Sequence, residues 1–167
     1  VPDRPLRTFA LDLDGLRASS VTVEGRAATA RQDGIDLTIT PPLPVPAAKE
    51  VTVAVAYGGR PRGADVAPHL APVGWWRSGD LRLAVGQPVG SSTWFPANET
   101  LADKAGWHLT VTVPRDLEAV ANGLLEDVAS GPTTTTWSWA MDQPMAPSLA
   151  LLAIGRFDRR VDEGPRD

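Results

Sequence analysis

The sequence contains no cysteine. A disulfide framework, a thiolate nucleophile and a cysteine-ligated metal site are therefore excluded for this chain. It also lacks a cluster of lysine and arginine, and its net charge of −4 does not suit a phosphate-binding surface. We therefore expect no nucleic-acid partner. No apolar run approaches about 18 residues, so the sequence predicts no membrane-spanning helix and no membrane partner.

Histidine is scarce, with only His69 and His108. Neither belongs to a His-Glu-x-x-His motif, and no spacing suggests a carboxylate as a third ligand, so we predict two unrelated histidines and no metal site. A Gly-x-Ser-x-Gly elbow is missing, which argues against a serine hydrolase. A catalytic triad is recognised by geometry rather than by sequence order, so the sequence alone leaves this class open.

The length of 167 residues suits one domain. The first residues include no Met and no signal peptide, so we expect the chain to be part of a longer protein. The charged residues 159–167 read as a linker. We predict a single β-domain at residues 1–158 followed by a linker or tail at 159–167. The compartment stays open, with the cytoplasm favoured over secretion.

Apolar and polar residues alternate with a period of two along much of the chain, which predicts half-buried strands. The alternating sets are Val21 and Val23; Ile35, Leu37 and Ile39; Val51, Val53, Val55 and Tyr57; Leu81, Leu83 and Val85; and Trp107, Leu109, Val111 and Val113. A denser apolar run, Leu149 to Phe157, predicts a strand that is covered on both faces.

Turn residues separate these sets. Glu24-Gly25-Arg26, Asp33-Gly34 and Gly58-Gly59 predict chain reversals. The prolines of residues 41–46 predict an extended connector. Helical signals amount to one turn at residues 102–105. Many short strands at this spacing predict an all-β fold, a mostly antiparallel β-sandwich.

Six tryptophans stand against a single tyrosine. Trp137 and Trp139 share one strand face and alternate with other residues, which favours core packing. Trp75 and Trp76 are predicted to lie in a loop before a strand, and Trp94 follows a glycine-rich segment. These three residues could form a platform for a peptide or a glycan.

Five sequence blocks follow one another in the second half of the chain. They are residues 86–99 (GQPVGSSTWFPANE), 103–114 (DKAGWHLTVTVP), 119–123 (AVANG), 136–150 (TWSWAMDQPMAPSLA) and 154–158 (IGRFD). Together they resemble the N-terminal domain of the aminopeptidase N family of zinc metallopeptidases (gluzincins). The strands upstream fit the same domain more loosely. The resemblance implies a saddle-like, mostly antiparallel β-domain that packs on a thermolysin-like catalytic domain in cis.

The resemblance also implies a role for Gln87. In the family, a Gln or Glu of this segment reaches the catalytic cleft and binds the free α-amine of the peptide. An amide oxygen can accept a hydrogen bond from an ammonium group, so the role is chemically sound. Two departures from the family pattern are Ala97, where Cys is common, and the segment Glu99-Thr100-Leu101, where Asp-x-Pro is common.

The zinc-binding His-Glu-x-x-His helix, the downstream Glu ligand and the Gly-x-Met-Glu-Asn motif do not occur in this sequence. The resemblance therefore implies no catalytic residue, no metal ligand and no cofactor in this chain, and no peptidase activity for it alone. Zinc and the general base would belong to the catalytic domain of the parent protein.

Three hypotheses follow. The first is a non-catalytic N-terminal domain of a zinc aminopeptidase, which walls the active-site cleft and helps to bind the N-terminal amine of peptide substrates. The second is a stand-alone β-sandwich module that binds peptide or glycan. The third is a structural domain without a ligand. The first hypothesis predicts one strongly apolar face, because that face would meet the catalytic domain.

Overall fold

The computed structural model describes residues 2–64 and 73–158. Within these ranges the chain is built from β-strands and two short 3-10 turns, so the predicted all-β class is confirmed. The strands are β1 Phe9–Asp12, β2 Arg17–Val23, β3 Arg26–Ala27, β4 Thr29–Asp33, β5 Asp36–Thr40, β6 Val53–Gly58, β7 Gly63–Ala64, β8 Val73–Ser78, β9 Leu81–Val85, β10 Ala105–Pro114, β11 Glu118–Ala121, β12 Leu124–Ser130, β13 Thr134–Met145 and β14 Leu151–Gly155. The 3-10 turns are η1 Ser91–Thr93 and η2 Pro147–Leu149. No described segment forms a helix that is long and apolar enough to cross a membrane.

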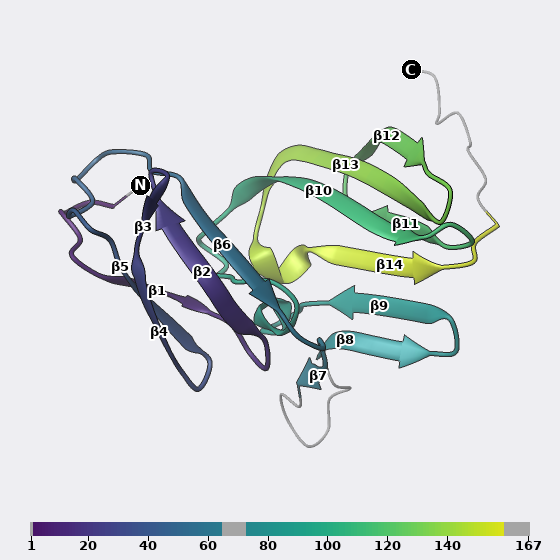
Figure 1. Cartoon of the computed structure of the whole chain (residues 1–167), viewed down its shortest axis with the longest axis horizontal. Coiled ribbons are helices and arrows are strands. Elements are labelled where there is room, and N and C mark those ends of the chain that lie inside the picture. The colour runs from purple at the N-terminus through teal and green to yellow at the C-terminus, as the bar shows by residue number, and fades with distance from the viewer. Residues whose placement is uncertain (1, 65–72, 159–167) are drawn as a thin grey trace.

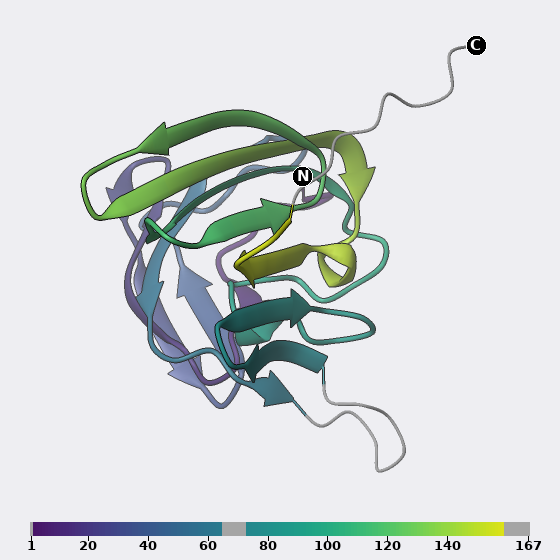
Figure 2. The same ribbon diagram turned by 90° about the vertical axis from the view of Figure 1, so that its right-hand side faces the viewer.

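The strands form four antiparallel sheets (Figure 1). The N-terminal half holds two three-stranded sheets, in the orders β1-β5-β4 and β3-β2-β6. The C-terminal half holds a three-stranded sheet, β10-β13-β12, and a five-stranded sheet, β11-β14-β9-β8-β7. Figure 2 turns the C-terminal strands toward the viewer and shows the N-terminal sheets behind them.

Each half of the molecule has its own hydrophobic core. The N-terminal sheets enclose Leu13, Leu16, Val21, Val23, Leu37, Ile39 and Val45. The C-terminal sheets enclose Ala84, Val113, Ala119, Trp137 and Leu152. Trp137 is only 6% exposed, and Trp139 packs against the same core while its Nε1 donates to the Ala119 carbonyl at 3.0 Å. The predicted core role of both tryptophans is confirmed.

A short bridge joins the two halves. The Asp12 amide donates to the Ala97 carbonyl at 2.7 Å, and the Ala97 amide donates back to the Asp12 carbonyl at 3.0 Å. The Asp14 amide donates to the Ser92 carbonyl at 2.9 Å, and Oδ2 of Asp12 accepts from the Glu99 amide at 3.2 Å. The segment 86–99 is therefore fastened to strand β1 of the N-terminal half.

Most of the alternating sets lie in strands as predicted. Leu37 and Ile39 are buried on β5, and the face of β10 that carries Trp107 and Val113 packs inward. Two predicted reversals, at Gly25 and Gly34, have φ angles of 71° and 60°, which glycine adopts without steric cost. The proline run connects β5 to β6 without forming a regular strand, as predicted.

Several local predictions were wrong. Trp75 and Trp76 lie inside β8 rather than in a loop, because their backbones pair with Ala84 and Leu83 of β9. The helical turn at residues 102–105 is absent, since β10 begins at Ala105. Leu149 lies in η2 and is 48% exposed, so the strand of this run, β14, begins only at Leu151, and its Leu151 and Ala153 are only half-buried. Residues 65–72 with His69, and the predicted linker at 159–167, lie outside the described residues.

Candidate functional site

Residues 86–99, which we call the signature loop, connect β9 to β10 and contain η1. The three η1 residues Ser91, Ser92 and Thr93 are at most 4% exposed. Buried hydroxyl groups need partners, and two find them here: Oγ of Ser91 donates to the Pro147 carbonyl at 2.7 Å, and Oγ1 of Thr93 donates to the Gly90 carbonyl at 2.7 Å. Small polar residues thus fix the loop to η2 and to itself.

Glu99, the first residue of the segment Glu99-Thr100-Leu101 that departs from the resemblance, also holds this loop. Oε1 of Glu99 accepts from the buried Ser92 amide at 2.9 Å. The other departure, Ala97, is 4% exposed and exchanges backbone hydrogen bonds with Asp12. Glu99 thus satisfies an η1 amide, and Ala97 forms the bridge to β1.

Two glycines let the signature loop lie close to its neighbours. A Cβ atom at Gly90 would lie 2.7 Å from the Gly74 amide nitrogen of β8, and one at Gly86 would lie 3.0 Å from the Ser148 carbonyl oxygen. Real Cβ atoms do not approach backbone atoms as closely as 2.7 Å. The ends of the segment 86–90 are therefore held against β8 and η2, and the residues between them project outward.

Gln87 lies in this projecting part and is exposed. It lines a hollow of about 170 Å³ together with Val85, Gly86, Ser148, Leu149, Ala150 and Leu151. The neighbouring Val89 and Leu149 are 44% and 48% exposed. A single carboxamide thus stands at the edge of a small, mostly apolar hollow, on a loop that is fixed at both ends.

The remaining sequence candidates are not brought together. His108 projects from the exposed side of β10, and its Nδ1 lies 4.0 Å from Oε2 of Glu126. In the described ranges no group of three or more His, Cys, Asp or Glu side chains is placed to hold a metal ion.

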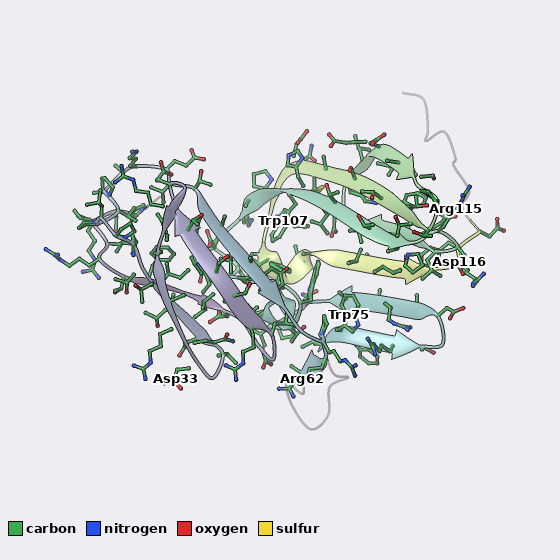
Figure 3. The ribbon with its side chains drawn as sticks, viewed as in Figure 1. Asp33, Arg62, Trp75, Trp107, Arg115 and Asp116 are labelled. Atoms are coloured by element: carbon green, nitrogen blue, oxygen red, sulfur yellow. The ribbon has the colours of Figure 1, made fainter. Side chains whose placement is uncertain are left out.

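The three tryptophans of the platform hypothesis do not share one surface. Trp75 and Trp76 are neighbours on β8, so their side chains point to opposite faces of the sheet. Trp75, labelled in Figure 3, and Trp94 pack against the C-terminal core, whereas Trp76 is 39% exposed. A flat aromatic binding platform is not formed by these residues.

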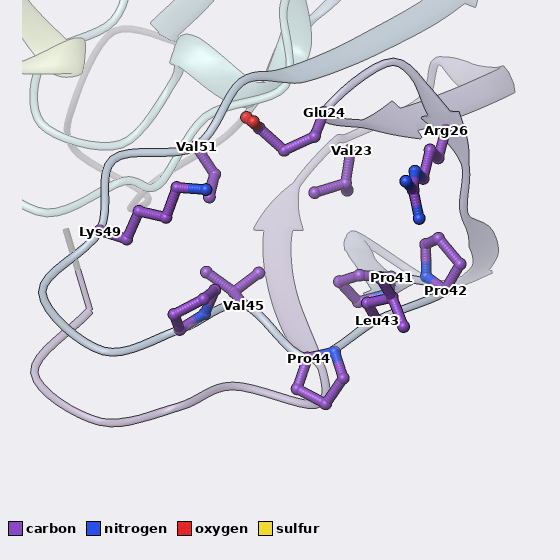
Figure 4. A pocket seen from close by; sticks show the side chains of 11 residues that line it. Val23, Glu24, Arg26, Pro41, Pro42, Leu43, Pro44, Val45, Lys49 and Val51 are labelled. Atoms are coloured by element: carbon purple, nitrogen blue, oxygen red, sulfur yellow. The ribbon is translucent and has the colours of Figure 1, made fainter.

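Sequence reasoning missed a groove in the N-terminal half (Figure 4). The groove has a volume of about 410 Å³, and the proline run 41–46 forms one wall. Leu43 on this wall is 60% exposed. On the opposite side, Oε1 of Glu24 accepts a hydrogen bond from the Thr52 amide at 2.6 Å. The prolines predict the connector, but the groove depends on the β2–β3 turn lying beside it, which no local pattern encodes.

No protein family model matches the chain. A curated relative, transcription initiation factor TFIID subunit 2 of Drosophila melanogaster, is 36% identical over 75 residues, which are 43% of this chain and 6% of the relative. Its name says nothing of peptidase activity.

The fold matches solved structures over almost its whole length. A variant of a two-domain M1 zinc metallopeptidase bound to L-arginine superposes with a TM-score of 0.91 at 25% identity, covering 96% of this chain and 37% of that chain. A variant M1 zinc metallopeptidase from Deinococcus radiodurans, bound to a Tyr-Ser-Ala substrate, superposes with a TM-score of 0.90 at the same identity and coverage. The chain thus spans 37% of the length of these proteins.

Proposed function

Because the chain has the fold of the N-terminal domain of M1 zinc metallopeptidases, we propose that it is the non-catalytic domain of a zinc aminopeptidase. Residues 1–158 would form this domain and residues 159–167 the linker that leaves it. The domain walls the active-site cleft, and Gln87 accepts a hydrogen bond from the free N-terminal amine of the peptide. A thermolysin-like catalytic domain of the same polypeptide supplies the zinc ion and the general base.

The observation that carries this proposal is the position of Gln87. Recognition of an ammonium group requires an acceptor that is accessible yet held in place, because a loose group loses binding free energy through ordering. Gln87 is exposed, whereas the loop that bears it is fixed by buried Ser91 and Thr93. A carboxamide accepts without adding charge, so it can orient an ammonium group next to a metal centre.

The test uses the intact polypeptide that carries this chain, assayed with aminoacyl chromogenic substrates. A hydrogen bond to a charged group is worth about 1.5–3 kcal/mol, so Gln87→Ala should lower kcat/KM roughly 10- to 150-fold. Gln87→Glu keeps an acceptor oxygen and should retain much more activity than Gln87→Ala. The matched control is Gln143→Ala, which truncates an exposed glutamine on β13 outside the hollow.

Equal kcat/KM values for Gln87→Ala and Gln143→Ala would overturn the assigned role of Gln87. The domain assignment has separate tests. A coding sequence that continues into a His-Glu-x-x-His motif supports it, and turnover by the rigorously purified 167-residue chain with added zinc contradicts it.

A further inference from the structure

The strand register of the five-stranded sheet divides its side chains into two faces. Directly paired residues project to the same side of an antiparallel sheet, and alternate residues project to opposite sides. Val120 pairs with Ala153, Ala153 with Leu83, and Leu83 with Trp76, which gives one row across β11, β14, β9 and β8. The next row on the same side joins Leu151 to Val85. We call this side, made of Trp76, Leu81, Leu83, Val85, Val120, Leu151 and Ala153, the outer face.

The other side of the sheet is the inner face, and it already has a partner. The register places Trp75, Ala84, Leu152 and Ala121 in one row of this face, and Ala84 and Leu152 are at most 5% exposed. Both pack in the C-terminal core with Val113 and Trp137 of the sheet β10-β13-β12. None of the seven outer-face residues belongs to either hydrophobic core of the described chain.

The composition of the outer face does not suit contact with water. An antiparallel sheet with one solvated side normally carries polar residues on that side. Here the central strands β14 and β9 place only Leu151, Ala153, Leu81, Leu83 and Val85 there, besides a glycine. Polar groups occur at the margin, where the last row ends in Glu118 and Ser78. Trp76 and Leu81 are still 39% and 37% exposed, so the face offers large apolar side chains to a partner.

The outer face continues into the hollow beside Gln87. Val85 and Leu151 of the outer face also line that hollow, and Gln87 follows Val85 by two residues. A partner that receives Gln87 in its cleft must therefore also approach the outer face. The solved relative with a TM-score of 0.91 is a two-domain M1 zinc metallopeptidase, and this fold covers 37% of it.

We infer that the outer face of the sheet β11-β14-β9-β8 is the surface on which the catalytic domain docks in cis. This inference rests on the proposed function and names the contact surface that goes with it. Domain interfaces within one chain bury roughly 600–1,500 Å² and combine an apolar centre with a polar margin, as the outer face does. Trp76, at the β8 end of the central row, is the residue type that most often anchors such a contact.

The test measures the accessibility of single thiols, which is possible because the chain has no cysteine of its own. Ala153→Cys and Val120→Cys place small thiols on the outer face, and Thr110→Cys places one on the exposed side of β10 as the control. The intact polypeptide is treated with a maleimide, and modification of the peptides that contain each position is followed by mass spectrometry. Both outer-face thiols should react roughly tenfold or more slowly than the control, because they react only when the domains separate.

Cleavage of the linker followed by separation of the domains should restore the reactivity of the two outer-face thiols. Reaction rates equal to that of Thr110→Cys in the intact protein would overturn the inference. Protection that disappears on dilution of the intact protein would also overturn it, since a second copy would then be the occupant. Because this readout does not depend on catalysis, a failure here is distinct from a failure of the Gln87 kinetics.

Discussion

The contact of Gly90 with strand β8 allows one stability prediction to be worked out fully. Gly90 has φ −131°, which any residue adopts, so a side chain there is limited by space alone. The first atom that a Cβ would meet is the Gly74 amide nitrogen at 2.7 Å, followed by Cγ2 of Val73 at 2.8 Å. The nearest atom is backbone, so Gly90→Ala must move the signature loop or β8.

Overpacking of this kind costs about 1–3 kcal/mol. The matched control is Gly58→Ala at the end of β6, where a Cβ would meet nothing within 4 Å. Alanine at such a site stabilises by about 0.4–1 kcal/mol, because it restricts the unfolded chain. The two variants should therefore differ by about 1.5–4 kcal/mol in the free energy of unfolding. For a chain of this size that difference corresponds to roughly 3–16 °C in Tm.

Thermal denaturation followed by circular dichroism measures the difference, and urea denaturation gives the free energy. Equal stability of Gly90→Ala and Gly58→Ala would show that the loop does not lie against β8 in solution. The anchoring of Gln87 would then lose its structural basis. A destabilised Gly90→Ala variant with normal secondary structure is the expected result.

Two further predictions concern the N-terminal half. Leu13→Ala should lower the free energy of unfolding by about 2–5 kcal/mol, because Leu13 is 0% exposed in the N-terminal core. The control Leu124→Ala, at a 79% exposed position, should change this free energy by no more than about 0.5 kcal/mol. Similar urea midpoints for both variants would contradict the core assignment. Burial raises the pKa of the Tyr57 hydroxyl above its ordinary value of 10.0, so ultraviolet titration of this single tyrosine should give a midpoint above that value. The folded state favours the neutral hydroxyl, so the contribution of Tyr57 to the free energy of unfolding is fully present below pH 10.0 and is lost as the pH rises through the folded-state pKa. Tyr57→Phe should remove this loss. An unchanged dependence of the unfolding free energy on pH in Tyr57→Phe would refute the raised pKa of Tyr57.

The sequence predicts those parts of the fold that a local period encodes. Leu37 and Ile39 alternate with polar residues and form β5, and the dense apolar run ends in β14. Strands without that period are not visible in the sequence: β4 reads TARQD and β12 reads LLEDVAS. These strands form because their backbones pair with the next strand across a turn, and the turn signal marks the reversal but not the strand that leads into it.

The candidate site divides in the same way. Gln87 could be singled out only by the resemblance of residues 86–99, since a lone loop glutamine has no chemical signature. Its exposure and the fixing of its loop depend on Pro147, which lies 56 residues from the Ser91 that donates to it. Small buried residues such as Ser91 and Gly90 look unremarkable in a sequence, because the neighbours that require them come from distant strands.

The adjacent tryptophans of β8 bring the two proposals together. Two large apolar residues in succession on a strand cannot both enter one core, because their side chains leave opposite faces of the sheet. Trp75 packs against the C-terminal core, so Trp76 points to the outer face, where it is 39% exposed. Strand β14 of the same sheet is also apolar on both sides, so its outer side likewise lacks a partner in either core of the described chain. Under the docking inference, the sheet covers the C-terminal core with one side and presents Trp76 and Leu83 to the catalytic domain with the other. Gln87 lies at the end of this face, because it lines one hollow with Val85 and Leu151, so the role proposed for Gln87 and the proposed docking surface require the same partner.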